Sequence, residues 1–233
     1  MKRFYKTVTA EPDGDGAVIR LDGRLLKTPA KADMRLPSLA LAQAIAEEWQ
    51  AQQDEIRPTT MPLTQLAATA IDRVAADPRF ATEEVVRYGG TDLLSYRADE
   101  PAALAARQAA EWQPLLDWFR DRYDVQLNVT TGIIAVAQPA ELLPRLERVC
   151  VGLDAYALTA LHWATTNTGS VVIGLALLDG RLDAEAACRT ALIDELHQSA
   201  KWGEDAEAAA RRAGLLADLQ AIARFLGLLR ARN

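Results

Sequence analysis

Short runs of apolar and β-branched residues alternate with turn-forming residues over the first 36 positions of the chain. Residues 4–8, 17–21 and 24–29 have the composition of strands. The segment 11–16 is rich in Pro, Asp and Gly, and Asp22-Gly23 is typical of a two-residue hairpin turn. The pattern therefore predicts a small antiparallel sheet of three strands. Such a sheet is marginally stable unless another element covers its apolar face.

A helical pattern follows these strands, opened by a proline and a serine. Leu41, Ile45 and Trp49 recur at the spacing of one helix face. Glu47 and Glu48 fall largely outside that apolar stripe. We expect this helix to pack on the apolar face of the sheet.

Beyond Pro62 the apolar residues recur at spacings of three and four, and alanine supplies many of them. Residues 126–136 are an exception, because they are β-like and a candidate further strand for the N-terminal sheet. We therefore predict an α+β protein. A small N-terminal antiparallel sheet with a covering helix forms a domain at residues 1–60, and a larger, mainly helical domain follows at residues 61–233.

Two details of the helical part depend on single residues. Asp183 is a typical helix cap, and the pattern after it predicts one long helix to about Lys201. Pro114 lies inside another apolar stripe, so we expect a break or kink near Trp112.

Composition limits the class of protein. The chain has 233 residues, half of them hydrophobic, and a formal net charge of −6. Basic residues form no long run, so nucleic acid is not an expected partner.

The sequence also indicates where the protein is located. The longest apolar run, at residues 171–178, is too short to cross a bilayer, and the basic N-terminus lacks the apolar stretch of a signal sequence. Two cysteines without metal-like or redox-like spacing favour a reducing compartment. We therefore expect a cytoplasmic protein that does not insert into membranes.

Recognisable catalytic motifs are absent from the sequence. It contains no phosphate loop and no nucleophile elbow, and Gly14 and Gly16 lie in a predicted turn with isoleucine where a dinucleotide fingerprint needs its third glycine. The two histidines, His162 and His197, each have two readings. For His162, a partly buried helix histidine paired with a neighbour is favoured over a metal ligand or a base. For His197, a position on the helix surface is favoured, and a hydrogen bond to an acidic neighbour is the alternative. We expect no catalytic residue, no metal site and no cofactor.

The segment Tyr88-Gly89-Gly90-Thr91-Asp92 is the most unusual loop in the sequence. In one interpretation it is a turn that cradles a ligand with the oxygens of Thr91 and Asp92. In the favoured interpretation the glycines end one helix and Thr91 or Asp92 caps the next.

The acidic stretch near residue 195 is the main candidate for partner binding. On a helix, Cys188, Leu192, Glu195 and Trp202 share one side, so Glu195 lies close to an apolar stripe. This carboxylate is either paired inside the protein or forms an acidic handle beside an aromatic anchor for a partner protein. Asp194 and Glu195 point roughly 100° apart on a helix, which argues against a catalytic carboxylate pair.

Five segments, in this order, carry a resemblance to a known family. They are Arg3-Phe4-Tyr5-Lys6 with Leu21-Asp22-Gly23-Arg24-Leu25-Leu26-Lys27-Thr28-Pro29; Glu47-Glu48-Trp49-Gln50 with Gln53-Asp54; Thr60-Met61-Pro62-Leu63-Thr64; Tyr88-Gly89-Gly90-Thr91-Asp92-Leu93-Leu94; and Asp194-Glu195 with Gln198 and Lys201-Trp202-Gly203-Glu204-Asp205. Over nearly its whole length the chain resembles the chaperone family that assembles the F1 part of ATP synthase by binding its α subunit.

The resemblance implies a non-enzymatic, ATP-independent chaperone. Its partner is expected to be the newly made F1 α subunit, held until the β subunit replaces the chaperone. Eukaryotic members act in the mitochondrial matrix, whereas this chain resembles a bacterial, cytoplasmic member. The family's late acidic helix implies partner-binding roles for Asp194 and Glu195, with Trp202 as a neighbour, although His197 stands where the family has an aromatic residue.

An enzyme remains the alternative hypothesis. It would use His162, His197 and nearby carboxylates on a small molecule, with or without a metal ion. This reading requires these groups to converge in one pocket, whereas a chaperone allows them to be scattered.

Overall fold

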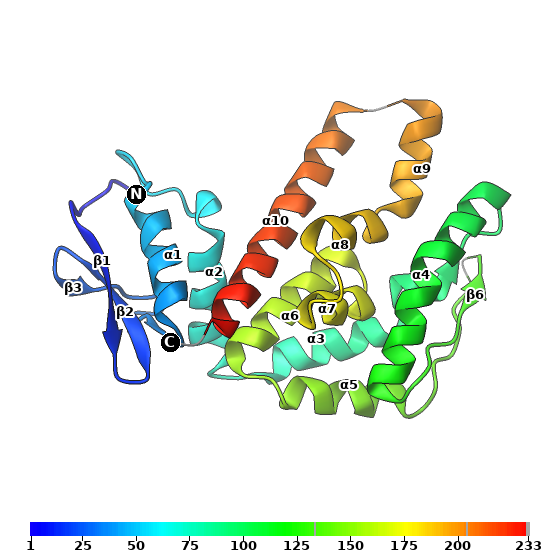
Figure 1. The fold of residues 1–233 in the computed structure, drawn as a ribbon, viewed down its shortest axis with the longest axis horizontal. Helices are drawn as coiled ribbons and strands as arrows, with labels where there is room; N and C mark the ends of the chain where they lie inside the picture. Colours follow the sequence, from blue (N-terminus) through cyan, green and yellow to red (C-terminus); the bar gives the residue numbers. More distant parts are fainter. Residues whose placement is uncertain (133, 204, 232–233) are drawn as a thin grey trace. The chain divides into compact units, whose positions relative to one another are not determined.

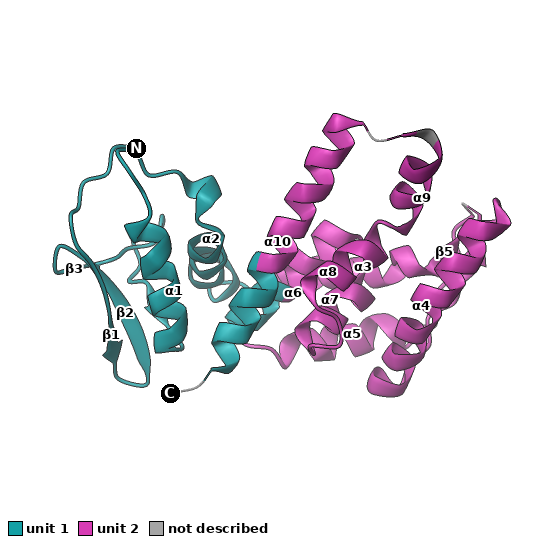
Figure 2. Cartoon of the chain, turned by 45° about the horizontal axis from the view of Figure 1, so that its top comes forward, with its two compact units in different colours: residues 1–78, 155–160, 221–233 teal, residues 79–154, 161–220 magenta. Residues whose placement is uncertain are grey.

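The computed structural model describes residues 1–132, 134–203 and 205–231, with only the backbone of Trp202. Contacts within it divide the chain into two compact units (Figure 2). Unit 1 comprises residues 1–78, 155–160 and 221–233, and unit 2 comprises residues 79–154 and 161–220. The division of domains at residue 60 stays a prediction.

The N-terminal sheet has four antiparallel strands: β1 (Val8–Asp13), β2 (Gly16–Leu21), β3 (Arg24–Leu25) and β4 (Arg35–Leu36). Strand β2 pairs with the other three. The predicted hairpin turn is present, since Asp22 and Gly23 have φ values of 47° and 78°. Asp22 also accepts backbone hydrogen bonds from Lys6 and Thr7, which fasten the segment before β1.

The sequence pattern predicts the first strand at residues 4–8, and this placement is wrong. It runs from Val8 to Asp13, through residues whose composition indicated a turn. Pro12 is tolerated there because β1 lies at the edge of the sheet, where its one strand partner among the described residues is β2, so the missing N–H breaks no second ladder.

Helix α1 (Leu39–Gln50) covers the sheet and contacts β1 and β2, as Figure 1 shows. The Ser38 side chain accepts a hydrogen bond from the Leu41 N–H at 3.1 Å and so caps the helix. The predicted stripe is confirmed, because Leu41, Ile45 and Trp49 are all buried. A 3-10 turn (Pro58–Thr60), helix α2 (Pro62–Thr69) and a π-helical turn (Ala70–Val74) follow. The α+β class is therefore confirmed.

The rest of the chain is mostly helical. Its elements are α3 (Arg79–Gly90), a 3-10 turn (Leu93–Ser95), β5 (Tyr96–Arg97), α4 (Ala102–Tyr123), β6 (Thr130–Thr131), α5 (Leu142–Val151), α6 (Ala155–Thr168), α7 (Val171–Leu178), α8 (Ala184–Ala191), α9 (Ile193–Trp202) and α10 (Ala206–Arg230).

Helix α7 lies at the core of unit 2. Seven of its eight residues are buried, and it contacts α3, α4 and α8. Gly174 permits a close approach to α6, because a Cβ atom there would lie 2.7 Å from the Oγ1 atom of Thr165. The apolar run at residues 171–178, which is too short to cross a membrane, is thus a buried helix. Across the described residues, none of the helices combines the length and apolarity of a membrane span.

Three local expectations differ from the structure. The predicted helix from Asp183 to Lys201 is two helices, because Leu192 leaves helical geometry at φ −105° and ψ 18°. Helix α4 continues through Pro114, whose side chain is exposed, so water can reach the carbonyl group that loses its N–H partner. In the described part of the β-like segment 126–136, the one strand is β6, which pairs in parallel with β5 rather than with the N-terminal sheet.

Candidate functional site

The start of α9 positions both acidic residues that the sequence singled out. Asp183 caps α8, accepting from the Ala186 N–H at 2.7 Å, and the chain then bends at Leu192. Asp194 and Glu195 fall in the first turn of α9, where the helix dipole favours negative charge.

The two carboxylates make different contacts. Gln108 of α4 donates a hydrogen bond from its Nε2 atom to Asp194 Oδ1 at 2.6 Å. Glu195 binds two guanidinium groups of α10, with Arg211 Nη2 at 2.9 Å from Oε2 and Arg212 Nη1 at 2.9 Å from Oε1. Asp194 and Glu195 thus contact different elements, α4 and α10, which agrees with their angular separation on the helix.

The environment of Glu195 determines its ionisation. Burial acts to raise the pKa of the Glu195 carboxyl, but hydrogen bonds and charges from Arg211 and Arg212 outweigh it and hold the pKa below its usual value. The Glu195 side chain is 24% exposed and that of Arg212 is 12% exposed. The carboxylate is therefore ionised at neutral pH and bound mainly within the protein.

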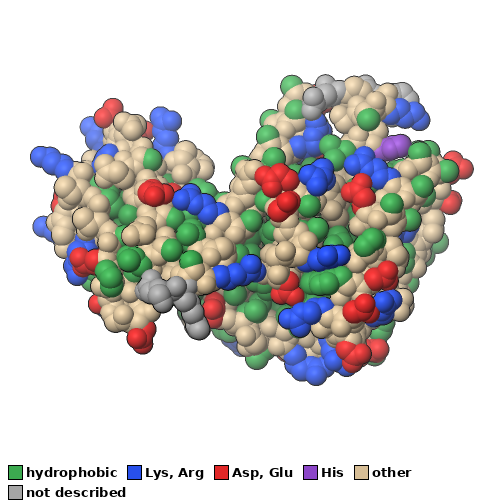
Figure 3. Space-filling model, in the orientation of Figure 1, with side chains coloured by type: hydrophobic (Ala, Val, Ile, Leu, Met, Phe, Trp, Pro, Cys, Tyr) green, Lys and Arg blue, Asp and Glu red, His purple; other side chains and the backbone are tan. Residues whose placement is uncertain are grey.

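This clamp between α9 and α10 could not be read from the sequence, because its partners lie 16 and 17 residues away across a helix reversal. On the face shown in Figure 3, acidic and basic side chains are interspersed along α8–α10 rather than gathered into one charge patch. Trp202, the third predicted partner-binding residue, ends α9. Its side chain lies outside the described residues.

The loop at residues 88–94 takes the structural role that the sequence favours. Asp92 is completely buried and caps the 3-10 turn that follows, accepting from the Leu94 N–H at 2.9 Å. It also accepts from Ser170 Oγ and from the Val172 N–H at the start of α7. Burial raises the pKa of Asp92 to about 6, although these hydrogen bonds act to lower it. Its oxygens accept hydrogen bonds from protein donors, as a capping residue does.

The two histidines lie on different helices and have different surroundings. His162 of α6 lies 2.6 Å from Glu84 of α3 and has the ring of Phe80 against its edge. His197 lies on α9 and is partly buried. Within residues 1–132, 134–203 and 205–231, no three His, Cys, Asp or Glu side chains are grouped so that they could hold a metal ion.

A family model and several solved structures match this chain. A family model described as ATP12 chaperone protein matches residues 2–120. The crystal structure of Atp12 from Paracoccus denitrificans has a TM-score of 0.92 and 44% identity, covering 98% of each chain. An aspartate-to-lysine variant of P. denitrificans Atp12p gives the same values.

Two further relatives match the chain at lower sequence identity. The Atu1473 protein of Agrobacterium tumefaciens has a TM-score of 0.92 and 40% identity, with coverage of 98% of this chain and 86% of that one. The mitochondrial protein atp12 of Schizosaccharomyces pombe is 27% identical, over 88% of this chain and 75% of the yeast protein.

The fold and these matches define the class of protein as a chaperone that serves in the assembly of ATP synthase. More specifically, the chain belongs to the ATP12 chaperone family.

Proposed function

We propose that this chaperone binds the unassembled F1 α subunit of ATP synthase, keeps it from aggregating and passes it to the β subunit. The observation that carries the proposal is the full-length similarity to Atp12 of P. denitrificans, with 98% of each chain aligned at 44% identity. A match of this extent supports a shared client as well as a shared fold. The bacterial relatives are more similar than the mitochondrial one, which supports a cytoplasmic location.

The exposed surface of an unassembled subunit determines what a chaperone that binds it must provide. A ring subunit without its neighbour exposes apolar surface that its assembled form buries, and such patches aggregate. A chaperone that covers this surface needs complementary apolar area with a polar rim. Its binding must also be weak enough for the β subunit to replace it. None of these steps requires ATP hydrolysis or catalysis, so we propose an ATP-independent, non-enzymatic mechanism.

We further propose that the first turn of α9 contributes to client binding through Asp194 and Glu195, with Trp202 as their neighbour. Glu195 is committed to two arginines of α10, so its part is to fix the position of α9. Among the described residues, Asp194 makes a single hydrogen bond, to a neutral amide, and this leaves its charge available to a partner. Of the two, Asp194 is the better candidate for direct contact.

Light scattering by the F1 α subunit tests this proposal. We expect the wild-type chaperone, at an equimolar concentration, to suppress aggregation of α diluted from denaturant, equally with and without ATP. Asp194→Asn keeps the hydrogen-bond acceptor and removes the charge, and several-fold more of this variant should be needed. Asp99→Asn, at an exposed position outside α9, is the control and should behave as wild type.

Either of two results would count against the proposal. Suppression that needs ATP would refute the ATP-independent mechanism. Equal behaviour of Asp194→Asn and wild type would remove Asp194 from the binding surface while leaving the client assignment intact.

A further inference from the structure

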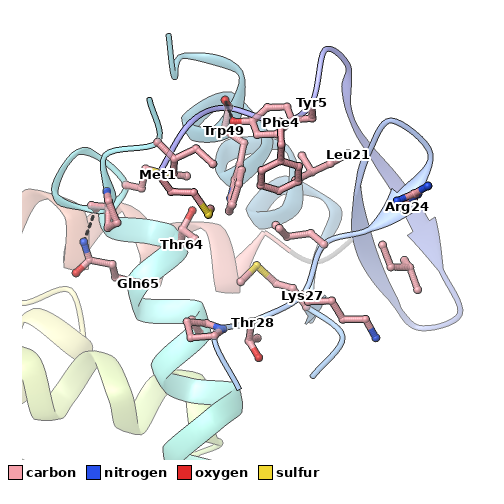
Figure 4. A pocket seen from close by; sticks show the side chains of 18 of the residues that line it. Met1, Phe4, Tyr5, Leu21, Arg24, Lys27, Thr28, Trp49, Thr64 and Gln65 are labelled. Carbon is pink, nitrogen blue, oxygen red and sulfur yellow. Dashed lines mark hydrogen bonds between the residues drawn. The ribbon is translucent and has the colours of Figure 1, made fainter. Parts of the chain in front are cut away.

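A cavity of about 890 Å³ lies within unit 1 (Figure 4). Its walls come from the N-terminal segment, the β2–β3 hairpin, the end of α1, and α2. Figure 4 shows the rings of Phe4 and Trp49 and the side chain of Leu21 lying toward one another along this space. Its volume is near the upper end of the range for ligand pockets, and most of its lining residues are apolar.

The methionines of the chain are concentrated here. The sequence has only three, Met1, Met34 and Met61, and all three line this cavity. Methionine side chains are flexible and polarisable, and they are over-used at surfaces that accept varied apolar partners. Met1 is 76% exposed, whereas Met34 and Met61 are each 2% exposed and belong to the buried wall of the cavity. The flexible thioether of Met1 can therefore adapt to the shape of an apolar chain at the exposed side of the cavity.

Hydrogen bonds anchor the N-terminal segment on one side of the cavity, and an aromatic residue of that segment is exposed. The Tyr5 hydroxyl donates to the backbone carbonyl of Trp49 at 2.7 Å, and the Arg3 N–H donates to the Asp54 carbonyl at 2.9 Å. Phe4, which lies between these anchored residues in the sequence, is 63% exposed. A large exposed aromatic at the edge of an apolar cavity is typical of an interaction site.

The charges beside the cavity favour a negatively charged occupant. The Asp22 carboxylate is occupied by hydrogen bonds from Lys6 and Thr7, and Lys27 is paired with Asp33. Arg24 is exposed and has no side-chain partner among the described residues. The first 36 residues carry eight basic and five acidic side chains, whereas the whole chain has a net charge of −6.

We propose that this cavity binds an extended segment of the client subunit, with apolar side chains inside it and a carboxylate at Arg24. This inference rests on the proposed function, because the client is the F1 α subunit. The flexible side chain of Met1 suits a peptide segment whose side chains differ in shape. The unpaired guanidinium group suits a carboxylate, which it can bind through two parallel hydrogen bonds.

Site-specific photo-crosslinking tests the location. p-Benzoylphenylalanine replaces Phe4 in one variant and Val151, a 75% exposed residue of α5, in a control variant. We expect irradiation with the α subunit to give a crosslink from position 4 that maps to an apolar segment containing Asp or Glu. Position 151 should give none. Crosslinking from position 151 alone would overturn the cavity proposal and leave the proposed function standing.

Binding measurements with charge variants test the chemistry. Phe4→Glu and Arg24→Glu should each weaken binding of the α subunit at least tenfold. Val151→Glu and Arg181→Glu, at exposed positions of unit 2, are matched controls and should change it less than twofold. Circular dichroism and urea unfolding confirm that each variant is folded, which is expected because the replaced side chains are exposed.

The remaining outcomes separate the two proposals. Unchanged α binding by both test variants would overturn the cavity proposal alone. If dodecanoate binds the wild type and the two variants lose only this binding, the cavity is a site for a small amphiphile and the proposal is wrong. If the wild-type chaperone fails to bind α, the proposed function fails, and the assignment of this occupant fails with it.

Discussion

Replacing Asp92 by alanine is expected to lower the free energy of unfolding by about 3 kcal/mol or more, because several buried donors lose their acceptor together. The Asp92 side chain is completely buried, and Ser170 Oγ lies 2.8 Å from one of its oxygens. The backbone N–H groups of Leu94 and Val172 lie at 2.9 and 3.1 Å. The substitution thus removes one side chain that ties the 3-10 turn after α3 to the start of α7.

Urea unfolding followed by circular dichroism measures this effect. Asp121→Ala serves as the control, since the Asp121 side chain is 70% exposed and pairs with its neighbour Arg120, and we expect a change within about 0.5 kcal/mol. A loss below about 1 kcal/mol for Asp92→Ala would contradict the capping role.

The pH dependence of stability gives an independent test of the same residue. Burial raises the pKa of Asp92 to about 6, so between about pH 4 and this value the folded protein holds a proton that the unfolded chain releases. The contribution of Asp92 to the free energy of unfolding therefore falls as the pH rises through this window. Asp92→Asn does not titrate, and its stability should lack this decline. Parallel pH profiles of the two proteins would contradict the raised pKa.

Glu48→Ala is expected to produce the second large effect, a loss of about 2 kcal/mol in the free energy of unfolding. Glu48 belongs to α1 but caps α2, accepting from the Leu63 and Thr64 N–H groups at 2.8 Å and from Thr64 Oγ1 at 2.7 Å. Met61, at the N-cap position of α2, supplies no side-chain cap of its own. The carboxylate thus serves the first turn of a helix that has no local cap.

The adjacent residue offers a matched control. The Glu47 side chain is 72% exposed and pairs with Arg224 at 3.1 Å, so Glu47→Ala should change the free energy of unfolding by about 0.5 kcal/mol or less. Equal losses for the two variants in urea unfolding would show that the capping of α2 does not stabilise unit 1.

The elements predicted correctly from the sequence depend on local chemistry. The hairpin at Asp22-Gly23 and the stripe of Leu41, Ile45 and Trp49 are determined by neighbouring residues, and both are present. The expectations that failed depend on distant contacts. Strand β1 extends through Pro12 because β2 offers a partner along its whole length, and β6 pairs with β5 across α4.

The contacts of Glu48 and Glu195 also depend on residues that are distant in the sequence. Glu48 lies off the apolar stripe of α1, and nothing in its own segment indicates that it receives the N–H groups of a later helix. The sequence offers two readings of Glu195, an internal pair and a partner contact. The structure supplies Arg211 and Arg212 as the internal partners, and the contact with a client stays a prediction.

Co-expression with the F1 α subunit of the same organism, in the absence of β, tests the central claim most directly. We expect α to be soluble only with the chaperone, to co-elute with it on size exclusion as a complex, and to leave that complex when β is added. If α aggregates regardless of the chaperone and no complex elutes, the proposed holding of the α subunit is contradicted.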